Sequence, residues 1–258
     1  MKFGLFFEMT TPRPWGRDSE KKKLEETLEQ IVLGDKLGFD HVWITEHHFM
    51  EEYCHASAPE VILSAAAQIT KNIRIGHGVR HAPPKYNHPV RTAEMAGTLD
   101  LVSNGRVDMG FGSSGSECEL GGFNISNDQK HEMSYEAIEQ IANMMAMEPY
   151  PGFKGKHFSM PARNIVPKPL QKPHPPFWLA CSARPTILEA AKKGMGALCF
   201  SFLEASEAKE WIDEYYDLFK NECKPIGHTV NPNFSLFTGF GVHKDENIAA
   251  DRFLEGLR

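Results

Sequence analysis

A glutamate and two histidines follow directly on one short apolar run of the sequence. Glu46, His47 and His48 come after Val42-Trp43-Ile44. A continuous apolar run is typical of a buried strand, so these three ionisable side chains lie where the strand ends. Histidine is the side chain that exchanges a proton near neutral pH without a large shift in its pKa. The triplet therefore predicts acid–base chemistry at the end of a strand. A solvated loop with two exposed histidines is the alternative.

Glycines interrupt the ends of the next two predicted strands. The first reads Gly76-His77-Gly78-Val79, and the second ends in Gly110-Phe111-Gly112. Glycine weakens a strand unless another group must approach the main chain closely. We interpret these glycines as a surface against which a flat ligand lies. The alternative is that they relieve crowding among side chains inside a narrow barrel.

Two serine-containing segments carry the donors that an anion needs. Ser113-Ser114-Gly115-Ser116 follows the second of these strands, and Ser182-Ala183-Arg184-Pro185-Thr186 begins a predicted helix. Unpaired N–H groups and the helix dipole favour phosphate at such a helix start. Each segment alone is a weak indication, because serine is common at helix N-caps. Together they predict a phosphorylated cofactor.

The rest of the chain alternates short apolar runs with longer amphipathic segments, which is the pattern of an α/β protein with a parallel sheet. The predicted strands span 3–7, 41–45, 73–79, 106–112, 177–181, 197–202 and 234–242. The predicted helices span 20–37, 59–70, 89–103, 128–147, 184–193, 206–223 and 245–257. A proline-rich excursion at 148–176 follows the fourth helix and excludes a regular helix there.

The first connection and the number of elements decide between two α/β folds. A doubly wound sheet would place a glycine-rich phosphate turn after its first strand, whereas Glu8-Met9-Thr10-Thr11-Pro12 follows here. A TIM (β/α)8 barrel needs one strand and one helix more than the segments above supply. We therefore predict a single domain over residues 1–258, a TIM (β/α)8-type barrel that lacks its last βα unit. The carboxyl ends of barrel strands form the catalytic face.

The composition excludes several classes of partner and location. The 258 residues are 41% hydrophobic and 24% charged, which is ordinary for a globular protein with a large core. A net charge of -6 argues against a nucleic-acid partner. No apolar run approaches the ~18 residues of a membrane span, and no signal peptide is recognisable. Five scattered cysteines without C-x-x-C spacing are typical of a reduced, cytoplasmic protein.

Two other kinds of catalytic site fit the sequence less well. Twelve histidines invite a metal site, but no H-x-H pair follows the first strand. His47 and His48 are consecutive and would tend to point to opposite sides of an extended backbone. We therefore expect no metal. A nucleophilic hydrolase would need a G-x-S-x-G elbow, which the serine segments lack.

Four motifs occur along the chain in a fixed order. They are Met1-Lys2-Phe3-Gly4, G-F-D-H-V-W-I-T-E-H-H-F at 38–49, Asn87-His88-Pro89-Val90-Arg91, and L-D-L-V-S-N-G-R at 99–106. On these motifs the chain resembles the bacterial luciferase-like monooxygenase superfamily, and the likeness runs from residue 1 to near residue 255. The resemblance implies a TIM-barrel fold and a flavin-dependent monooxygenase, which passes one atom of O₂ to a small, apolar organic substrate.

The resemblance also implies a cofactor and partners. Members use reduced FMN, supplied by a separate flavin reductase, or the deazaflavin F420. A homodimer through segments 59–70 and 89–103 is implied as well. The alternatives are an F420-dependent oxidoreductase that transfers hydride and a non-catalytic flavin-binding relative or subunit. Candidates for an apolar substrate pocket, or equally for the barrel core, are Phe7, Met9, Phe111 and Phe202.

The resemblance assigns roles to individual residues. His47 is implied as the catalytic histidine, and we expect His48 and Glu46 to orient its ring. The flavin ring would lie against Gly76, Gly78 and Val79, with a cis peptide bond between Gly78 and Val79. The phosphate would bind at Ser113, Ser182, Ala183 and Thr186. Ser113 stands where the family has an arginine that grips the phosphate, and Arg184 is a candidate to restore that charge.

Overall fold

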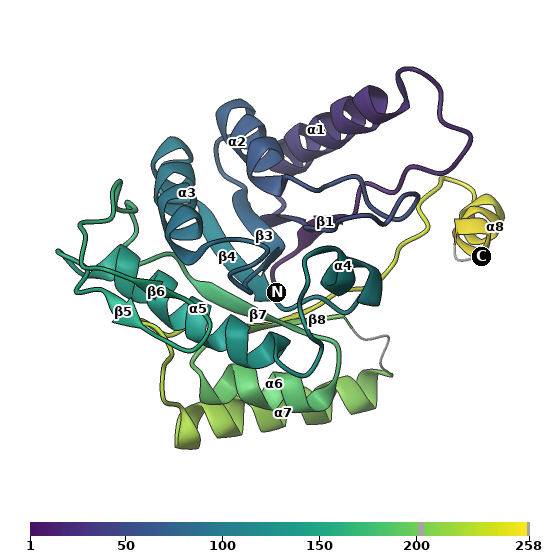
Figure 1. The fold of residues 1–258 in the computed structure, drawn as a ribbon. Coiled ribbons are helices and arrows are strands. Elements are labelled where there is room, and N and C mark those ends of the chain that lie inside the picture. Colours follow the sequence, from purple (N-terminus) through teal and green to yellow (C-terminus); the bar gives the residue numbers. More distant parts are fainter. Residues whose placement is uncertain (201–203, 257–258) are drawn as a thin grey trace.

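Seven parallel strands form one curved sheet, and they lie in it in the order in which they occur along the chain (Figure 1). The computed structural model describes residues 1–200 and 204–256. The strands are β1 (Gly4–Phe7), β2 (His41–Ile44), β3 (Arg74–His81), β4 (Val107–Gly112), β7 (Phe177–Cys181), β8 (Gly196–Cys199) and β9 (Phe234–Leu236). Among the described residues β1 and β9 are the two edges of the sheet. The predicted barrel without its last βα unit is confirmed as a half-open, curled sheet.

Helices connect the strands and pack along the outside of the curve (Figure 1). The main ones are α1 (Ser19–Leu37), α2 (Pro59–Ile69), α3 (Pro89–Val102), α5 (Lys130–Ala146), α6 (Arg184–Lys192) and α7 (Ala205–Glu222). Gly38 ends α1 with a φ of 84°, a left-handed conformation that glycine adopts without steric cost. In the parts of the chain that the structure describes, no helix has both the length and the apolar character to cross a membrane.

Side chains alternate along each strand between two apolar layers. Val42 and Ile44 of β2 belong to the large core between the sheet and the helices. Trp43, between them in sequence, contacts Trp178 of β7 with ring centroids 5.4 Å apart. Because β2 and β7 are not neighbours in the sheet, these two rings meet across its concave side. The inside of the curl is therefore filled by aromatic side chains at this level.

Three small elements were not predicted, and part of one predicted strand is not described. The helix α4 (Glu117–Gly122) follows β4, and the strands β5 (Phe153–Lys154) and β6 (Ser159–Met160) form a hairpin in the proline-rich excursion. The helix α8 (Glu246–Gly256) agrees with its prediction. The strand predicted over 197–202 ends at Cys199, and Phe202 lies outside the described residues.

The imidazole of His77 is fully buried on the side of β3 that faces the helices. Neither of its ring nitrogens has a hydrogen-bond partner among the described residues. Burial, and secondarily the charge of Arg80, lowers the pKa of His77 from 6.5 to about 3. Below pH 6.5 the unfolded chain takes up a proton on this residue while the folded chain does not. Stability is therefore lost as the pH falls from 6.5 toward 3.

Replacing His77 by leucine should make the stability of the protein less sensitive to acid. In the wild type, His77 alone lowers the free energy of unfolding by about 1.4 kcal/mol for each pH unit below 6.5. Leucine does not ionise, so the variant lacks this loss. Urea unfolding at pH 8 and at pH 5 measures the effect. The difference in free energy of unfolding between the two pH values should be about 2 kcal/mol smaller in the variant. An identical pH dependence in both proteins would contradict the buried, neutral state of His77.

Candidate active site

The Glu46-His47-His48 triplet follows β2 after one residue, Thr45, at the carboxyl edge of the sheet. The backbone N–H of Glu46 donates to the carbonyl of Val79 at 3.1 Å, which fixes the triplet against the end of β3. Glu46 is buried, whereas the side chains of His47 and His48 are 24% and 18% exposed. The triplet is therefore a partly enclosed edge of the sheet and not a solvated loop.

The two consecutive histidines contact two different carboxylates. His48 Nε2 lies 3.1 Å from Glu46 Oε1, and His47 Nδ1 lies 3.1 Å from Oε1 of Glu119 on α4. The expectation that Glu46 orients His47 is therefore corrected: Glu46 orients His48, and Glu119 orients His47. The rings of His47 and His48 both lie beside that of His81, with centroids 6.0 and 6.2 Å from it, yet a different carboxylate holds each ring.

Glu119 joins several parts of the site, although the sequence did not single it out. Its Oε1 accepts from the backbone N–H of His48 at 2.8 Å and lies 3.4 Å from His81 Nε2. Its Oε2 accepts from the hydroxyl of Ser114 at 2.7 Å. Burial alone would raise the pKa of Glu119, but hydrogen bonds with His47, His81 and Ser114 outweigh burial and hold the pKa well below its usual range. Glu119 is therefore ionised at neutral pH.

An ionised Glu119 sets the position of the proton on the His47 ring. A carboxylate only accepts hydrogen bonds, so His47 Nδ1 carries the hydrogen that points at Glu119. In the neutral ring, His47 Nε2 then has the free lone pair. His47 can accept a proton at Nε2, and Glu119 stabilises the imidazolium that results. This is the arrangement in which a buried carboxylate fixes the tautomer of a general base.

Glu46 is held in a second polar cluster. Asn87 Nδ2 donates to its Oε1 at 2.8 Å, and the backbone N–H of His81 donates to its Oε2 at 3.1 Å. Burial alone would raise the pKa of Glu46, but the hydrogen bond with His48 and the charge of Arg80 lower it to about 2. Arg80 is itself buried, with Nη1 3.9 Å from Glu46 Oε2. The site thus holds two ionised carboxylates, each paired with one histidine of the triplet.

The strand-end glycines make room for a neighbouring side chain. A Cβ on Gly76 would lie 2.3 Å from the Trp43 ring, and one on Gly78 would lie 2.9 Å from Trp43 Cβ. Relief of crowding inside the barrel, the alternative explanation, is thus sufficient for both positions. The Gly78–Val79 peptide bond is cis, as the resemblance implies. That Gly76, Gly78 and Val79 contact a flavin ring stays a prediction.

Aromatic side chains form a wall beside His48. The centroid of its ring lies 4.9 Å from that of Phe123 and 6.0 Å from that of Tyr86. The centroids of the Phe123 and Tyr86 rings are 4.3 Å apart. Phe49 continues the wall and is largely exposed. Of the apolar residues considered from the sequence, Met9 and Phe111 belong instead to the buried core behind the sheet.

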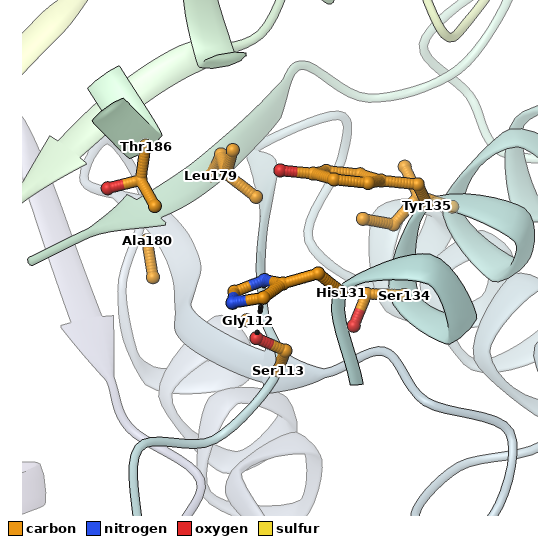
Figure 2. A pocket seen from close by; sticks show the side chains of 9 residues that line it. Gly112, Ser113, His131, Ser134, Tyr135, Leu179, Ala180 and Thr186 are labelled. Carbon is orange, nitrogen blue, oxygen red and sulfur yellow. Dashed lines mark hydrogen bonds between the residues drawn. The ribbon is translucent and has the colours of Figure 1, made fainter. Parts of the chain in front are cut away.

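A small cavity of about 20 Å³ lies between the ends of β4 and β7 and the starts of α5 and α6 (Figure 2). Its lining residues are Gly112, Ser113, His131, Ser134, Tyr135, Ile138, Leu179, Ala180 and Thr186. Figure 2 shows the His131 ring directed at Ser113, whose Oγ lies 3.3 Å from His131 Nδ1. Partial burial and the nearby charge of Lys130 lower the pKa of His131. Sequence reasoning missed His131, which lies in the first turn of a helix without any motif.

The predicted phosphate residues are only partly brought together. Ser113 and Thr186 line the cavity, whereas Ser182 and Ala183 do not. Ala183 is the N-cap of α6, and its carbonyl accepts from the Thr186 hydroxyl at 2.6 Å. Arg184 Nε donates to Glu214 on α7 at 2.7 Å, so this arginine is engaged on the surface and does not line the cavity.

Two consecutive serines join the cavity to the histidine cluster. Ser113 contacts His131, and Ser114 donates to Glu119. The chain turns between them, since Ser114 has a φ of 65°, in the left-handed region. The carbonyl of Ser114 also accepts from Lys130 Nζ at 2.8 Å, which ties the same turn to the start of α5.

Known proteins resemble this chain over nearly its whole length. The model of one family, described as luciferase-like monooxygenase, matches residues 1–257. The chain belongs to the luciferase-like monooxygenase family. It is 31% identical over 245 residues to the oxygenase component of a flavin-dependent trigonelline monooxygenase from Acinetobacter baylyi, covering 89% of this chain and 64% of that protein. The chain spans about half to two thirds of the length of the curated relatives it matches.

Solved structures of other proteins share the fold of this luciferase-like chain. The monooxygenase RslO1 from Streptomyces bottropensis superposes with a TM-score of 0.86 at 27% identity, covering 99% of this chain and 76% of that one. An F420-dependent secondary alcohol dehydrogenase superposes with a TM-score of 0.79 at 21% identity, covering 99% and 74%. The second likeness concerns the fold alone. The family therefore includes the chemistry of monooxygenases, and its fold extends to F420-dependent oxidoreductases.

Proposed function

We propose that this chain binds reduced FMN at the carboxyl edge of its sheet and, with O₂, oxygenates a small apolar organic substrate. The observation that carries the proposal is the His47–Glu119 pair: a partly exposed imidazole, oriented by a buried, ionised carboxylate, in a member of the luciferase-like family. The aromatic wall of Phe49, Tyr86 and Phe123 beside it supports an apolar substrate.

The cavity has the donors that a flavin phosphate requires. Its polar side chains are Ser113, His131, Ser134, Tyr135 and Thr186, and its lining includes no carboxylate. The hydroxyls of Ser134 and Thr186 donate to the carbonyls of Lys130 and Ala183, so in the proposal they turn toward the phosphate when it binds. A volume of about 20 Å³ accommodates a group roughly the size of one water molecule, such as a phosphate oxygen. In the proposal, Ser113, His131 and Thr186 hold the phosphate together with the α6 start at Ser182 and Ala183. Gly76, Gly78 and Val79 face the ring.

The protein contributes proton handling and shielding from water. When bound, the reduced flavin supplies the electrons that reduce O₂, so that one oxygen atom enters the substrate and the other leaves as water. His47 exchanges a proton at Nε2, while Glu119 holds its Nδ1–H and stabilises the charged ring. His48 is fixed by Glu46 and, with the aromatic wall, limits the access of water to the reacting groups.

Titration of the purified protein with reduced FMN and with reduced F420, while O₂ consumption is followed, tests the proposal. Binding of reduced FMN with O₂ uptake, coupled to oxygenation of an organic substrate, is the expected result. Binding of F420 without O₂ uptake would assign the chain to hydride transfer instead. Indifference to both cofactors would point to a non-catalytic relative or subunit.

Replacing His131 by asparagine should weaken FMN binding about tenfold but leave riboflavin binding unchanged. The reason is that riboflavin lacks the phosphate that His131 and Ser113 would contact, and one charge-assisted hydrogen bond is worth roughly 1.5–3 kcal/mol. Fluorescence titration with each flavin measures both affinities. Arg184→Gln is the matched control, because Arg184 pairs with Glu214 outside the cavity. Equal loss of both flavins in His131→Asn would exclude a phosphate role.

The partners follow from the same proposal. A separate flavin reductase would supply the reduced cofactor, which is supported by the likeness to an oxygenase component. A homodimer through α2 and α3 is supported by their exposed apolar residues, Val61, Ile69, Leu101 and Val102. We place the enzyme in the cytoplasm, in line with its five scattered cysteines, which lack C-x-x-C spacing.

A further inference from the structure

Three side chains from separate parts of the chain converge on one point at the carboxyl edge. They are His47 after β2, His81 at the end of β3, and Glu119 on α4. One ligand atom from each lies within 4.8 Å of the others. His47 Nδ1 lies 3.1 Å and His81 Nε2 lies 3.4 Å from Glu119 Oε1. In the described part of the chain, this is the only group of three or more histidine, cysteine or acidic side chains so placed.

Two imidazoles and one carboxylate make a donor set that suits zinc. Nitrogen and oxygen ligands lie about 2.0–2.2 Å from a tetrahedral zinc ion, so two ligand atoms are roughly 3.3–3.6 Å apart. The two distances to Glu119 already have about this size, and the distance between His47 Nδ1 and His81 Nε2 must shorten by about 1.5 Å at most. The rings of His47 and His81 are inclined at 70° with centroids 6.0 Å apart.

The surroundings of the three residues are those of a built site. Glu119 is buried, and the hydroxyl of Ser114 donates to its second oxygen at 2.7 Å. A partner of this kind orients a metal-ligating carboxylate. His81 is also buried, whereas His47 is partly exposed. Three protein ligands with one accessible side leave a fourth position for water.

We propose that His47, His81 and Glu119 bind one zinc ion, and that this ion switches off the acid–base role of His47. The second half rests on the proposed function. Zinc on His47 Nδ1 moves the proton of the neutral ring to Nε2, so the ring keeps no lone pair with which to accept a proton. The same holds for His81, whose proton moves from Nε2 to Nδ1.

Titration of the cofactor-free, full-length protein with Co²⁺, followed by displacement with Zn²⁺, tests the site. Cobalt in a four-coordinate site absorbs visible light strongly, and we expect one such ion per chain. Glu119→Gln and His81→Gln should each weaken binding about 100-fold or more, since even loss of a supporting residue costs 10–100-fold. His55→Asn is the control, because His55 and Glu20 form a pair at 2.9 Å outside the group.

The results separate the zinc site from the flavin chemistry. Circular dichroism checks the fold of each variant, and anomalous scattering at the zinc edge locates the ion in the wild type if a variant does not fold. Absence of stoichiometric cobalt binding, binding that survives both substitutions, or an ion on other histidines would overturn the site. Zinc that occupies the site without stopping substrate oxidation would overturn its inhibitory role. A zinc-binding protein without flavin activity would contradict the proposed function alone.

Discussion

Replacement of His47 by alanine is expected to lower the rate of substrate oxidation by about 10²–10⁴-fold, the usual loss when a general acid–base group is removed. Its Nδ1 is committed to Glu119 at 3.1 Å, and its Nε2 is the atom left to exchange a proton. The affinity for FMN should be nearly unchanged, because His47 does not line the cavity between β4 and β7. Product formation and O₂ uptake measure the rate, and fluorescence titration measures the affinity.

The design needs a control for loss of a histidine in general. His55 also pairs with a glutamate, Glu20, at 2.9 Å, so His55→Ala removes a similar contact away from the triplet and should keep the wild-type rate. Oxygen consumption that continues without product in His47→Ala would support a role in directing oxygen to the substrate. A His47→Ala protein that oxidises substrate at the wild-type rate would remove the role altogether.

Replacement of Glu119 by glutamine should reduce substrate oxidation nearly as much, by ~10²–10⁴-fold. Glutamine has the same shape, but it presents an N–H₂ donor as well as an oxygen. When the amide donor of glutamine faces His47 Nδ1, the neutral ring adopts the other tautomer, with its proton on Nε2. His47 Nε2 then has no lone pair with which to accept a proton from the reaction. Loss of the correct tautomer costs a general base about 10⁴-fold in serine proteases. A pH–rate profile of the variant beside that of the wild type is the decisive measurement, because loss of the catalytic tautomer should change the shape of the profile.

A neighbouring glutamate supplies the control for this substitution. Glu117 lies on the same short helix, is exposed, and accepts from Asn127 Nδ2 at 2.8 Å. Glu117→Gln should keep both the rate and the pH profile. If Glu119→Gln lost stability without any change in the pH profile of its residual activity, the carboxylate would be a structural group only.

The order of strands and helices could be predicted because it depends on local patterns. Alternating apolar runs and amphipathic segments appear directly in the sequence, and their carboxyl ends meet at one edge in any parallel α/β sheet. The placement of the triplet followed from this rule. The hairpin of β5 and β6 could not be foreseen, because each of its strands has two residues and carries no periodic signal.

Glu119 could not be found in the same way, because its partners are remote. It lies 72 residues from His47 in the sequence, and nothing local records that contact. Its only local signal is misleading: Ser116 and Glu119 have the spacing of a capping box. In the structure Ser116 is the N-cap of α4 but makes no side-chain cap, and Glu119 turns to the histidines instead. The hydrogen bonds that Glu119 makes with His47, His48 and Ser114 outweigh the local preference for a capping box.

Side-chain direction limits what two other sequence patterns establish. Trp43 lies against Gly76 and Gly78, so relief of crowding explains both glycines, and their contact with a flavin ring stays a prediction. Arg184 was a candidate for the missing phosphate charge, but its long side chain reaches Glu214 on α7. The direction of a side chain depends on the strand or helix packed beside it, and the sequence alone does not specify that packing.

The adjacency of Ser113 and Ser114 has a thermodynamic consequence. One peptide unit separates a hydroxyl that faces the cavity from a hydroxyl that holds Glu119. If a ligand in the cavity changes the proton affinity of the histidine cluster by some factor, protonation of the cluster must change the affinity for that ligand by the same factor. The pH dependence of flavin binding would then report on His47 and Glu119, even though neither residue contacts the phosphate.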